Sequence, residues 1–110
     1  MSSRYKRANT RYMVRLETQI IHGDQSTTGW IVDLSLGGAL VEVSSEASIP
    51  VGSRLDVSFG LPELDQPLTA KAEVRWVEEH AIGIQFVTGF RAKQTWALGK
   101  FLERQTPAAP

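Results

Sequence analysis

Two short polar motifs carry most of the chemistry that this sequence offers. Residues 7–11 (RANTR) have the pattern RxxxR and precede the first apolar run, while residues 33–38 (DLSLGG) have the pattern DxSxxG and separate two strand-like runs. Guanidiniums bind phosphates and the acceptor edge of guanine through forked donors. A carboxylate and a hydroxyl beside glycines accept hydrogen bonds from the donor edge of the same base, and they leave room for it to approach the backbone. Each motif alone is a weak signal, but their residue types are suited to bind phosphates and the edges of a guanine.

The composition indicates one soluble domain. The chain has 110 residues, of which 42% are hydrophobic and 22% charged, and it has no cysteine. Such a length supports a single core, and the absence of cysteine excludes disulfides and thiolate metal ligands. No apolar run approaches the roughly 20 residues that span a bilayer, and the basic N-terminus lacks the apolar segment of a secretory signal. We therefore expect a cytoplasmic protein with no membrane span.

The formal net charge of zero conceals an asymmetry along the chain. Residues 17–90 hold eleven of the twelve acids and three bases, whereas residues 1–16 contain no acid and five bases: Arg4, Lys6, Arg7, Arg11 and Arg15. An anion is therefore attracted to the N-terminal arm rather than to the body. Nucleic-acid binding is not expected, because the acidic body offers no basic reading element and its strands show no exposed aromatic ladder.

Alternating apolar residues predict six strands, at residues 12–22, 28–33, 39–43, 54–59, 68–78 and 82–86. The connections are too short for crossover helices, which favours an antiparallel barrel or sandwich.

Residues 90–105 instead have apolar side chains at helical spacing. This predicts a C-terminal helix that covers an open end or face of the barrel. Trp96 lies off its apolar stripe, where a partner contact is one interpretation.

The alternation is clearest in residues 68–78, where it predicts the faces on which Trp76 and Arg75 lie. Trp76 is in phase with Leu68, Ala70 and Val74, so core packing is the first interpretation of this residue. Near a strand end, Trp76 could alternatively present its ring to a guanine. Arg75 points to the opposite face and is expected to be a solvated charge.

The two motifs, the segment AEVRWVEEHAIGIQF at residues 72–86 and the terminal helix together resemble the PilZ domain, a bacterial receptor for cyclic di-GMP. The resemblance covers nearly the whole chain. It implies that residues 12–106 form a six-stranded antiparallel β-barrel of PilZ type, which ends in a C-terminal α-helix at about residues 90–105. It also implies a flexible basic N-terminal arm, residues 1–11, that closes over one face. Residues 107–110 are expected to form a disordered tail.

The same resemblance implies a ligand site with no metal and no cofactor. The residues expected to bind cyclic di-GMP are Lys6, Arg7, Arg11, Asp33, Ser35, Gly37, Gly38 and Trp76. A basic residue before RxxxR, here Lys6, implies that two intercalated ligands bind per chain. Taken alone, the segment from Asp33 to Ser35 favours an Asx-turn that joins two strands, and the ligand interpretation depends on its pairing with Arg7 and Arg11.

Catalysis has no visible agent in this sequence. His22 and His80 are isolated, and Ser35 lacks the setting of a nucleophile. We therefore expect a cyclic di-GMP receptor, not an enzyme, whose arm changes conformation on binding and transmits the signal to an unidentified partner protein. The alternative is an adaptor with the same fold that does not depend on a nucleotide.

Overall fold

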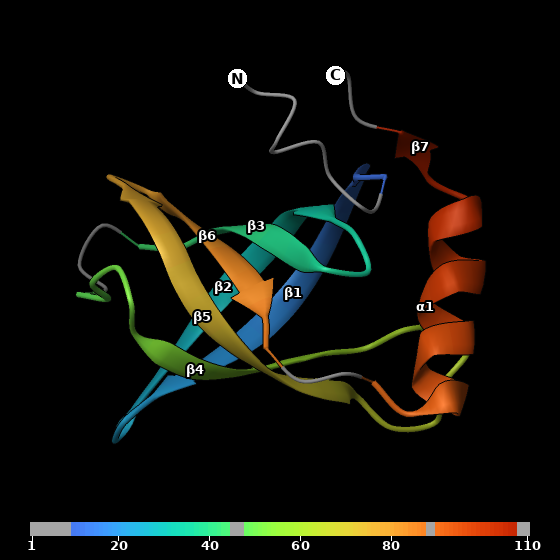
Figure 1. Ribbon diagram of the computed structural model, residues 1–110, viewed down its shortest axis with the longest axis horizontal. Helices are drawn as coiled ribbons and strands as arrows, with labels where there is room; N and C mark the ends of the chain where they lie inside the picture. Colours follow the sequence, from blue (N-terminus) through green and yellow to red (C-terminus); the bar gives the residue numbers. More distant parts are fainter. Residues whose placement is uncertain (1–9, 45–47, 88–89, 108–110) are drawn as a thin grey trace.

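The computed structural model describes residues 10–44, 48–87 and 90–107. Six antiparallel strands follow one another in the order β2-β3-β6-β5-β4-β1, and pairing of β1 with β2 closes them into a barrel (Figure 1). The strands are β1 (Tyr12–His22), β2 (Gln25–Leu34), β3 (Gly38–Glu42), β4 (Arg54–Phe59), β5 (Leu68–Glu78) and β6 (Ala81–Phe86). The six-stranded barrel with a C-terminal helix is therefore confirmed.

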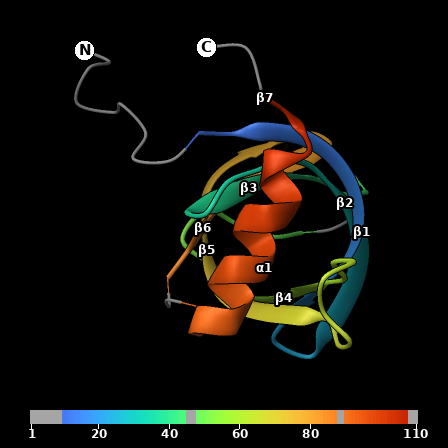
Figure 2. The same cartoon turned by 90° about the vertical axis from the view of Figure 1, so that its right-hand side faces the viewer.

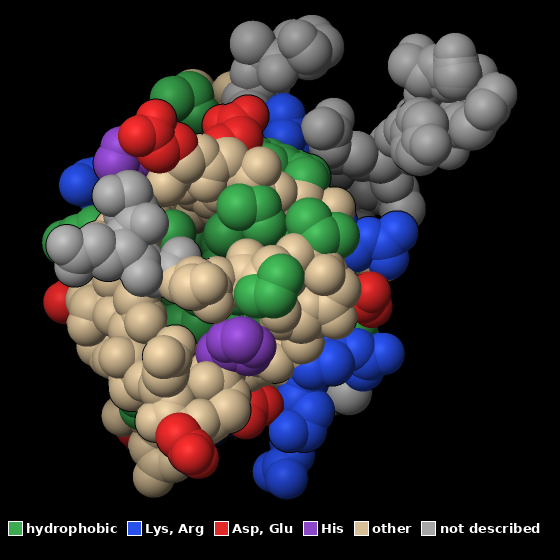
Figure 3. All heavy atoms as spheres, turned by 90° about the vertical axis from the view of Figure 1, so that its left-hand side faces the viewer, with side chains coloured by type: hydrophobic (Ala, Val, Ile, Leu, Met, Phe, Trp, Pro, Cys, Tyr) green, Lys and Arg blue, Asp and Glu red, His purple; other side chains and the backbone are tan. Residues whose placement is uncertain are grey.

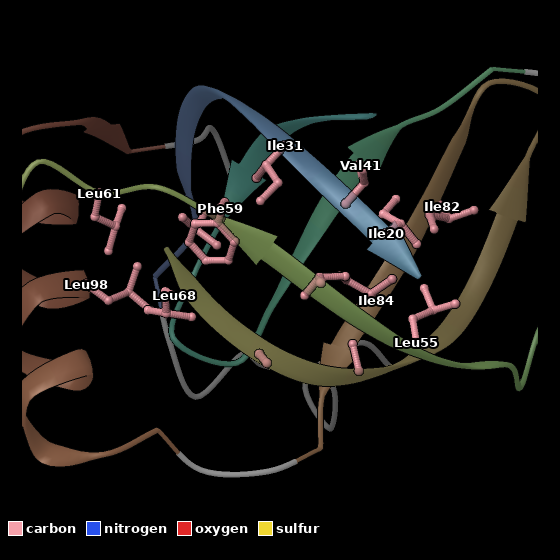
Figure 4. Packing of buried hydrophobic residues seen from close by; sticks show 14 of the residues in the cluster. Ile20, Ile31, Val41, Leu55, Phe59, Leu61, Leu68, Ile82, Ile84 and Leu98 are labelled. Carbon is pink, nitrogen blue, oxygen red and sulfur yellow. The ribbon is translucent and has the colours of Figure 1, made fainter. Parts of the chain in front are cut away.

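Strand alternation separates a dry interior from a polar outer face. Side chains such as Ile20, Val57 and Ile82 are at most 1% exposed, and they form one continuous core with those labelled in Figure 4. On the outer face the strands are joined by polar pairs, of which Lys71 Nζ with Asp56 Oδ1 at 3.0 Å is one. This division is what period-two patterns produce when only one face of a sheet is buried.

Helix α1 (Ala92–Glu103) lies across one end of the barrel, as Figure 2 shows. Its buried face consists of Ala97, Leu98, Phe101 and Leu102. Leu98 points toward Leu61 and Leu68 in the barrel end (Figure 4). Trp96 is 54% exposed, as its position off the apolar stripe predicted.

Among the described residues, no helix has the length and apolar character needed to cross a membrane.

At the barrel end that α1 does not cover, hydrophobic side chains gather near the centre, and Lys and Arg side chains line one side (Figure 3).

The end of the chain differs from expectation. Thr106 and Pro107 form a short strand, β7, that pairs antiparallel with Met13 and Tyr12 of β1. Pro107 was expected in the disordered tail. The first part of β1 is open to pairing because β4 pairs with this strand only over residues 18–21. β7 occupies that edge, where a proline is tolerated.

The remaining tail residues, 108–110, lie outside the described residues, and so do residues 1–9 of the arm. The expectations that the tail is disordered and that the arm is flexible stay predictions.

Packing of α1 on the barrel should supply a measurable part of the stability. Replacing the fully buried Leu98 with alanine removes apolar contacts and leaves a cavity, so Leu98→Ala should lower the free energy of unfolding by about 2–5 kcal/mol. Trp96→Ala, on the exposed side of the same helix, should change it by less than about 0.5 kcal/mol. Urea denaturation of both variants checks this, and equal losses would mean that the helix packs differently.

Candidate functional site

An extra residue in β2 turns Asp33 to the outside of the barrel. Ile31 pairs with Val41 and Asp33 pairs with Leu40, so Val32 has no partner on β3 and forms a β-bulge. With uninterrupted alternation Asp33 would share the inner face with Ile31. A bulge shifts the phase by one residue and reverses the face of those that follow. Asp33 is 9% exposed, at the edge of the outer surface.

A second bulge does the same for Trp76 in β5. Val74 pairs with Ile84 and Trp76 pairs with Gly83, which leaves Arg75 without a partner on β6. Trp76 therefore shares the outer face with Gly83 and is 42% exposed. Core packing, the first interpretation of Trp76, is wrong because its phase with Leu68 to Val74 ends at this bulge.

The two bulges bring four residues into one row on the outer face. Strand pairing places Asp33 beside Leu40, Leu40 beside Gly83, and Gly83 beside Trp76. The row crosses β2, β3, β6 and β5, so its ends are about 14 Å apart at the usual spacing of about 4.8 Å between strands. A Cβ at Gly83 would lie 2.2 Å from Nε1 of Trp76, so the indole rests on the space that this glycine leaves.

Ser35 organises the turn between β2 and β3. Its Oγ accepts hydrogen bonds from the backbone N–H of Gly37 at 3.0 Å and of Gly38 at 3.1 Å. Its own N–H donates to the carbonyl oxygen of Gly38 at 2.9 Å, and Ser35 is 7% exposed. The hydroxyl is thus engaged in fixing the turn, which is a structural role in addition to the ligand contact that we expected.

The glycine at position 38 is required by close packing. A Cβ at Gly38 would lie 2.3 Å from the carbonyl oxygen of Ile84, because β3 and β6 approach closely there. Glycines in turns often serve to adopt a positive φ. Among the described residues, positive φ occurs at Gly23 and Gly52 instead.

An ion pair joins the two motifs. Nη1 of Arg11 lies 3.2 Å from Oδ2 of Asp33, and both side chains are largely shielded from solvent. The arginine of the arm and the carboxylate of the turn are therefore neighbours, as the resemblance implied. Lys6 and Arg7 lie outside the described residues, so their contribution stays a prediction.

A cleft of about 360 Å³ unites the site. It contains every expected site residue that the structure describes: Arg11, Asp33, Ser35, Gly37, Gly38 and Trp76. Further residues that the sequence did not predict for the site also line the cleft: Ala39, Leu40, Arg75, Gly83, Ile84 and Gln85. The signal for Gly83 was present, since glycine within a strand often marks a bulge or a close approach.

The cleft has the chemistry of a binding site. It offers guanidinium donors, a carboxylate acceptor and an aromatic face. Neither His22 nor His80 is among the described residues that line it. The described residues also contain no group of three His, Cys, Asp or Glu side chains that could hold a metal ion.

Trp30 is a second exposed tryptophan on the outer face of β2, at 38% exposure, which the sequence did not lead us to expect. The guanidinium carbon of Arg15 lies 4.6 Å from its ring centroid. Trp30 pairs with Glu42, one row away from Trp76, and β3 and β6 lie between the two tryptophans. The two rings are therefore too far apart to form a continuous stacking surface.

A model of the PilZ domain family matches residues 5–104. The chain belongs to the PilZ domain family. PilZ domains are binding and receptor domains for cyclic di-GMP, and in general they are not enzymes. Among proteins of curated function, none matches this sequence significantly.

Solved structures share the fold at low sequence identity. The Bacillus subtilis inhibitor of motility, MotI/DgrA, aligns with a TM-score of 0.77 and 20% identity; the alignment covers 90% of this chain, which spans 50% of that protein. The PilZ domain of CeSA from a cellulose-synthesizing bacterium gives 0.66 and 19%, with 84% and 94% covered. The PilZ domain of Escherichia coli YcgR, solved with c-di-GMP, gives 0.71 and 15%, with 90% and 92% covered.

The close approach at Gly38 makes a testable prediction for stability. In Gly38→Ala the new methyl group meets the backbone oxygen of Ile84, so the β3–β6 pairing must shift. We expect a loss of about 1–3 kcal/mol in the free energy of unfolding. Gly60→Ala is the matched control, because nothing lies within 4 Å of a Cβ at Gly60. Thermal and urea unfolding measure both, and an unaffected Gly38→Ala would disprove the packing requirement.

Proposed function

We propose that this chain is a cyclic di-GMP receptor and that the cleft around the Arg11–Asp33 ion pair is its ligand site. The observation that carries the proposal is this ion pair at 3.2 Å, in a cleft that also contains the DxSxxG turn and an exposed tryptophan. Membership of a family of cyclic di-GMP receptors supports it. So does the shared fold of the YcgR PilZ domain, which was solved with c-di-GMP.

The ion pair suits both edges of a guanine. A carboxylate accepts from the N1–H and N2–H groups of the base, and a guanidinium donates to O6 and N7. Asp33 and Arg11 present these complementary groups side by side. In the free protein they satisfy each other, so a guanine must exchange that contact for its own.

Trp76 supplies a flat surface for the same ligand. Its ring is exposed in the cleft and rests beside Gly83, so a base can stack on it without a clash from β6. Stacking of a base on an aromatic side chain contributes about 1–3 kcal/mol.

The arm provides the response to the ligand. Lys6 and Arg7 add cations for the phosphates, and Arg11 leads directly into Tyr12 and Met13, which pair with β7. A change in the position of Arg11 would therefore act on the start of β1 and, through its pairing with β7, on the segment that follows α1. This continuity supports a conformational change of the arm that is transmitted to a partner protein.

Isothermal titration with cyclic di-GMP, GMP and a short single-stranded oligonucleotide tests the proposal. Saturable binding of cyclic di-GMP, tighter than that of GMP, is the expected result. A folded protein that binds none of the three would instead be a nucleotide-independent adaptor. Preference for the oligonucleotide would point to nucleic-acid binding.

Asp33 should read the base rather than the charge of the ligand. Asp33→Ala removes the acceptor for guanine N–H groups, so its affinity for cyclic di-GMP should fall at least about tenfold, with a smaller change for pyrophosphate. Asp56→Ala is the control, because that carboxylate pairs with Lys71 on the outer face of β4 and β5. Calorimetry with both ligands decides. Equal losses would show that Asp33 only shapes the turn.

The family resemblance also leads to a prediction of stoichiometry. Stacking two dianionic ligands is repulsive unless nearby cations offset the charge, and Lys6 precedes the RxxxR motif. Calorimetric saturation should occur at two ligands per chain for the parent and at one for Lys6→Leu, while Arg4→Leu should retain two. Added salt should lower the affinity for the second ligand more than the affinity for the first. A parent that saturates at one ligand, with Lys6→Leu unchanged, would reject this role for Lys6.

A further inference from the structure

Arg75 lines the cleft although the strand pattern makes it an ordinary surface residue. It is the extra residue of the β5 bulge, between the Val74–Ile84 and Trp76–Gly83 pairs. A bulge re-aims the side chains around it, and it raises the local twist of the strand. The same irregularity that exposes Trp76 thus brings a cation to the cleft.

Two other charges on the outer face of β5, Lys71 and Glu73, are used in cross-strand pairs. Nζ of Lys71 lies 3.0 Å from Oδ1 of Asp56, and Oε1 of Glu73 lies 3.7 Å from Nε of Arg54. Arg75 continues this series along β5, yet it forms no ion pair with a residue that the structure describes. Its guanidinium is therefore available to an anion or a base in the cleft.

The cleft has two ends with related chemistry. At one end Arg11 and Asp33 lie beside β2, and at the other Arg75 and Trp76 lie on β5. The strand spacing separates these ends by about 14 Å. A mononucleotide held by Asp33 leaves the distant end empty, whereas two linked nucleotides reach both ends.

We propose that Arg75 determines specificity by contacting the second nucleotide of the ligand, so that the cleft selects a dinucleotide over a mononucleotide. This inference rests on the proposed function. A guanidinium suits the role because its forked donors fit either a phosphate or the O6 and N7 atoms of guanine, and the neighbouring ring of Trp76 can hold the base flat. Lysine presents a single point charge and does not replace the fork.

The test compares the parent with Arg75→Ala, Arg75→Lys and the matched control Arg54→Ala. Arg54 is an outer-face arginine that does not line the cleft. Calorimetry measures the affinity for cyclic di-GMP. NMR chemical shifts of the Gly37 and Gly38 amides measure the affinity for GMP at concentrations up to the millimolar range. Melting temperatures establish that the three variants fold as the parent does.

We expect Arg75→Ala to bind cyclic di-GMP at least about tenfold more weakly and GMP within about twofold of the parent. Arg75→Lys should recover part of the loss, and Arg54→Ala should match the parent. An Arg75→Ala variant that binds cyclic di-GMP like the parent, or that loses both ligands equally, overturns the inference and leaves the proposed function intact. A folded parent that does not bind cyclic di-GMP overturns both.

Discussion

Every second side chain of each strand must fill the barrel interior, and the functional surface depends on where that rule is interrupted. Val32 and Arg75 are each an extra residue without a partner on the neighbouring strand. After each of them, side chains that would have faced the interior face outward instead. Asp33 and Trp76 reach the outer face for this reason. A core that is continuous on both sides of the bulges, from Ile31 to Ile84, keeps these two side chains in register.

The contacts within the cleft differ in how readily a ligand can replace them. The hydrogen bonds of the buried Ser35 hydroxyl fix the turn, so breaking them would leave partly buried backbone N–H groups unsatisfied. The Arg11–Asp33 pair joins two side chains, so breaking it leaves no backbone group unsatisfied, and the Arg11 side chain keeps about a third of its surface exposed. The turn therefore holds Asp33 in place, while under the proposed function a base would take over the contact that Asp33 makes with Arg11.

Much of this fold could be predicted from local patterns, and the exceptions have physical causes. Alternation located the six strands, and the helical stripe separated Leu98 from Trp96. Trp76 could not be placed, because a bulge depends on pairing with β6 and leaves no mark within its own strand. Pro107 was missed for a similar reason, since β7 exists only through the open edge of β1. The motifs singled out Asp33 and Arg11, which the structure brings together in one cleft, whereas the place of Arg75 in that cleft depends on the bulge.

The pairing of β7 with β1 also determines where the barrel is easiest to open. Pro107 has no amide hydrogen, so this two-residue ladder has fewer hydrogen bonds than the strands around it. Local opening begins where backbone hydrogen bonds are few and exposed. We expect the amide hydrogens near Met13 to exchange faster than those near Ile20, where β2 and β4 both pair with the strand. The segment that leads from Arg11 into the barrel is thus a natural hinge.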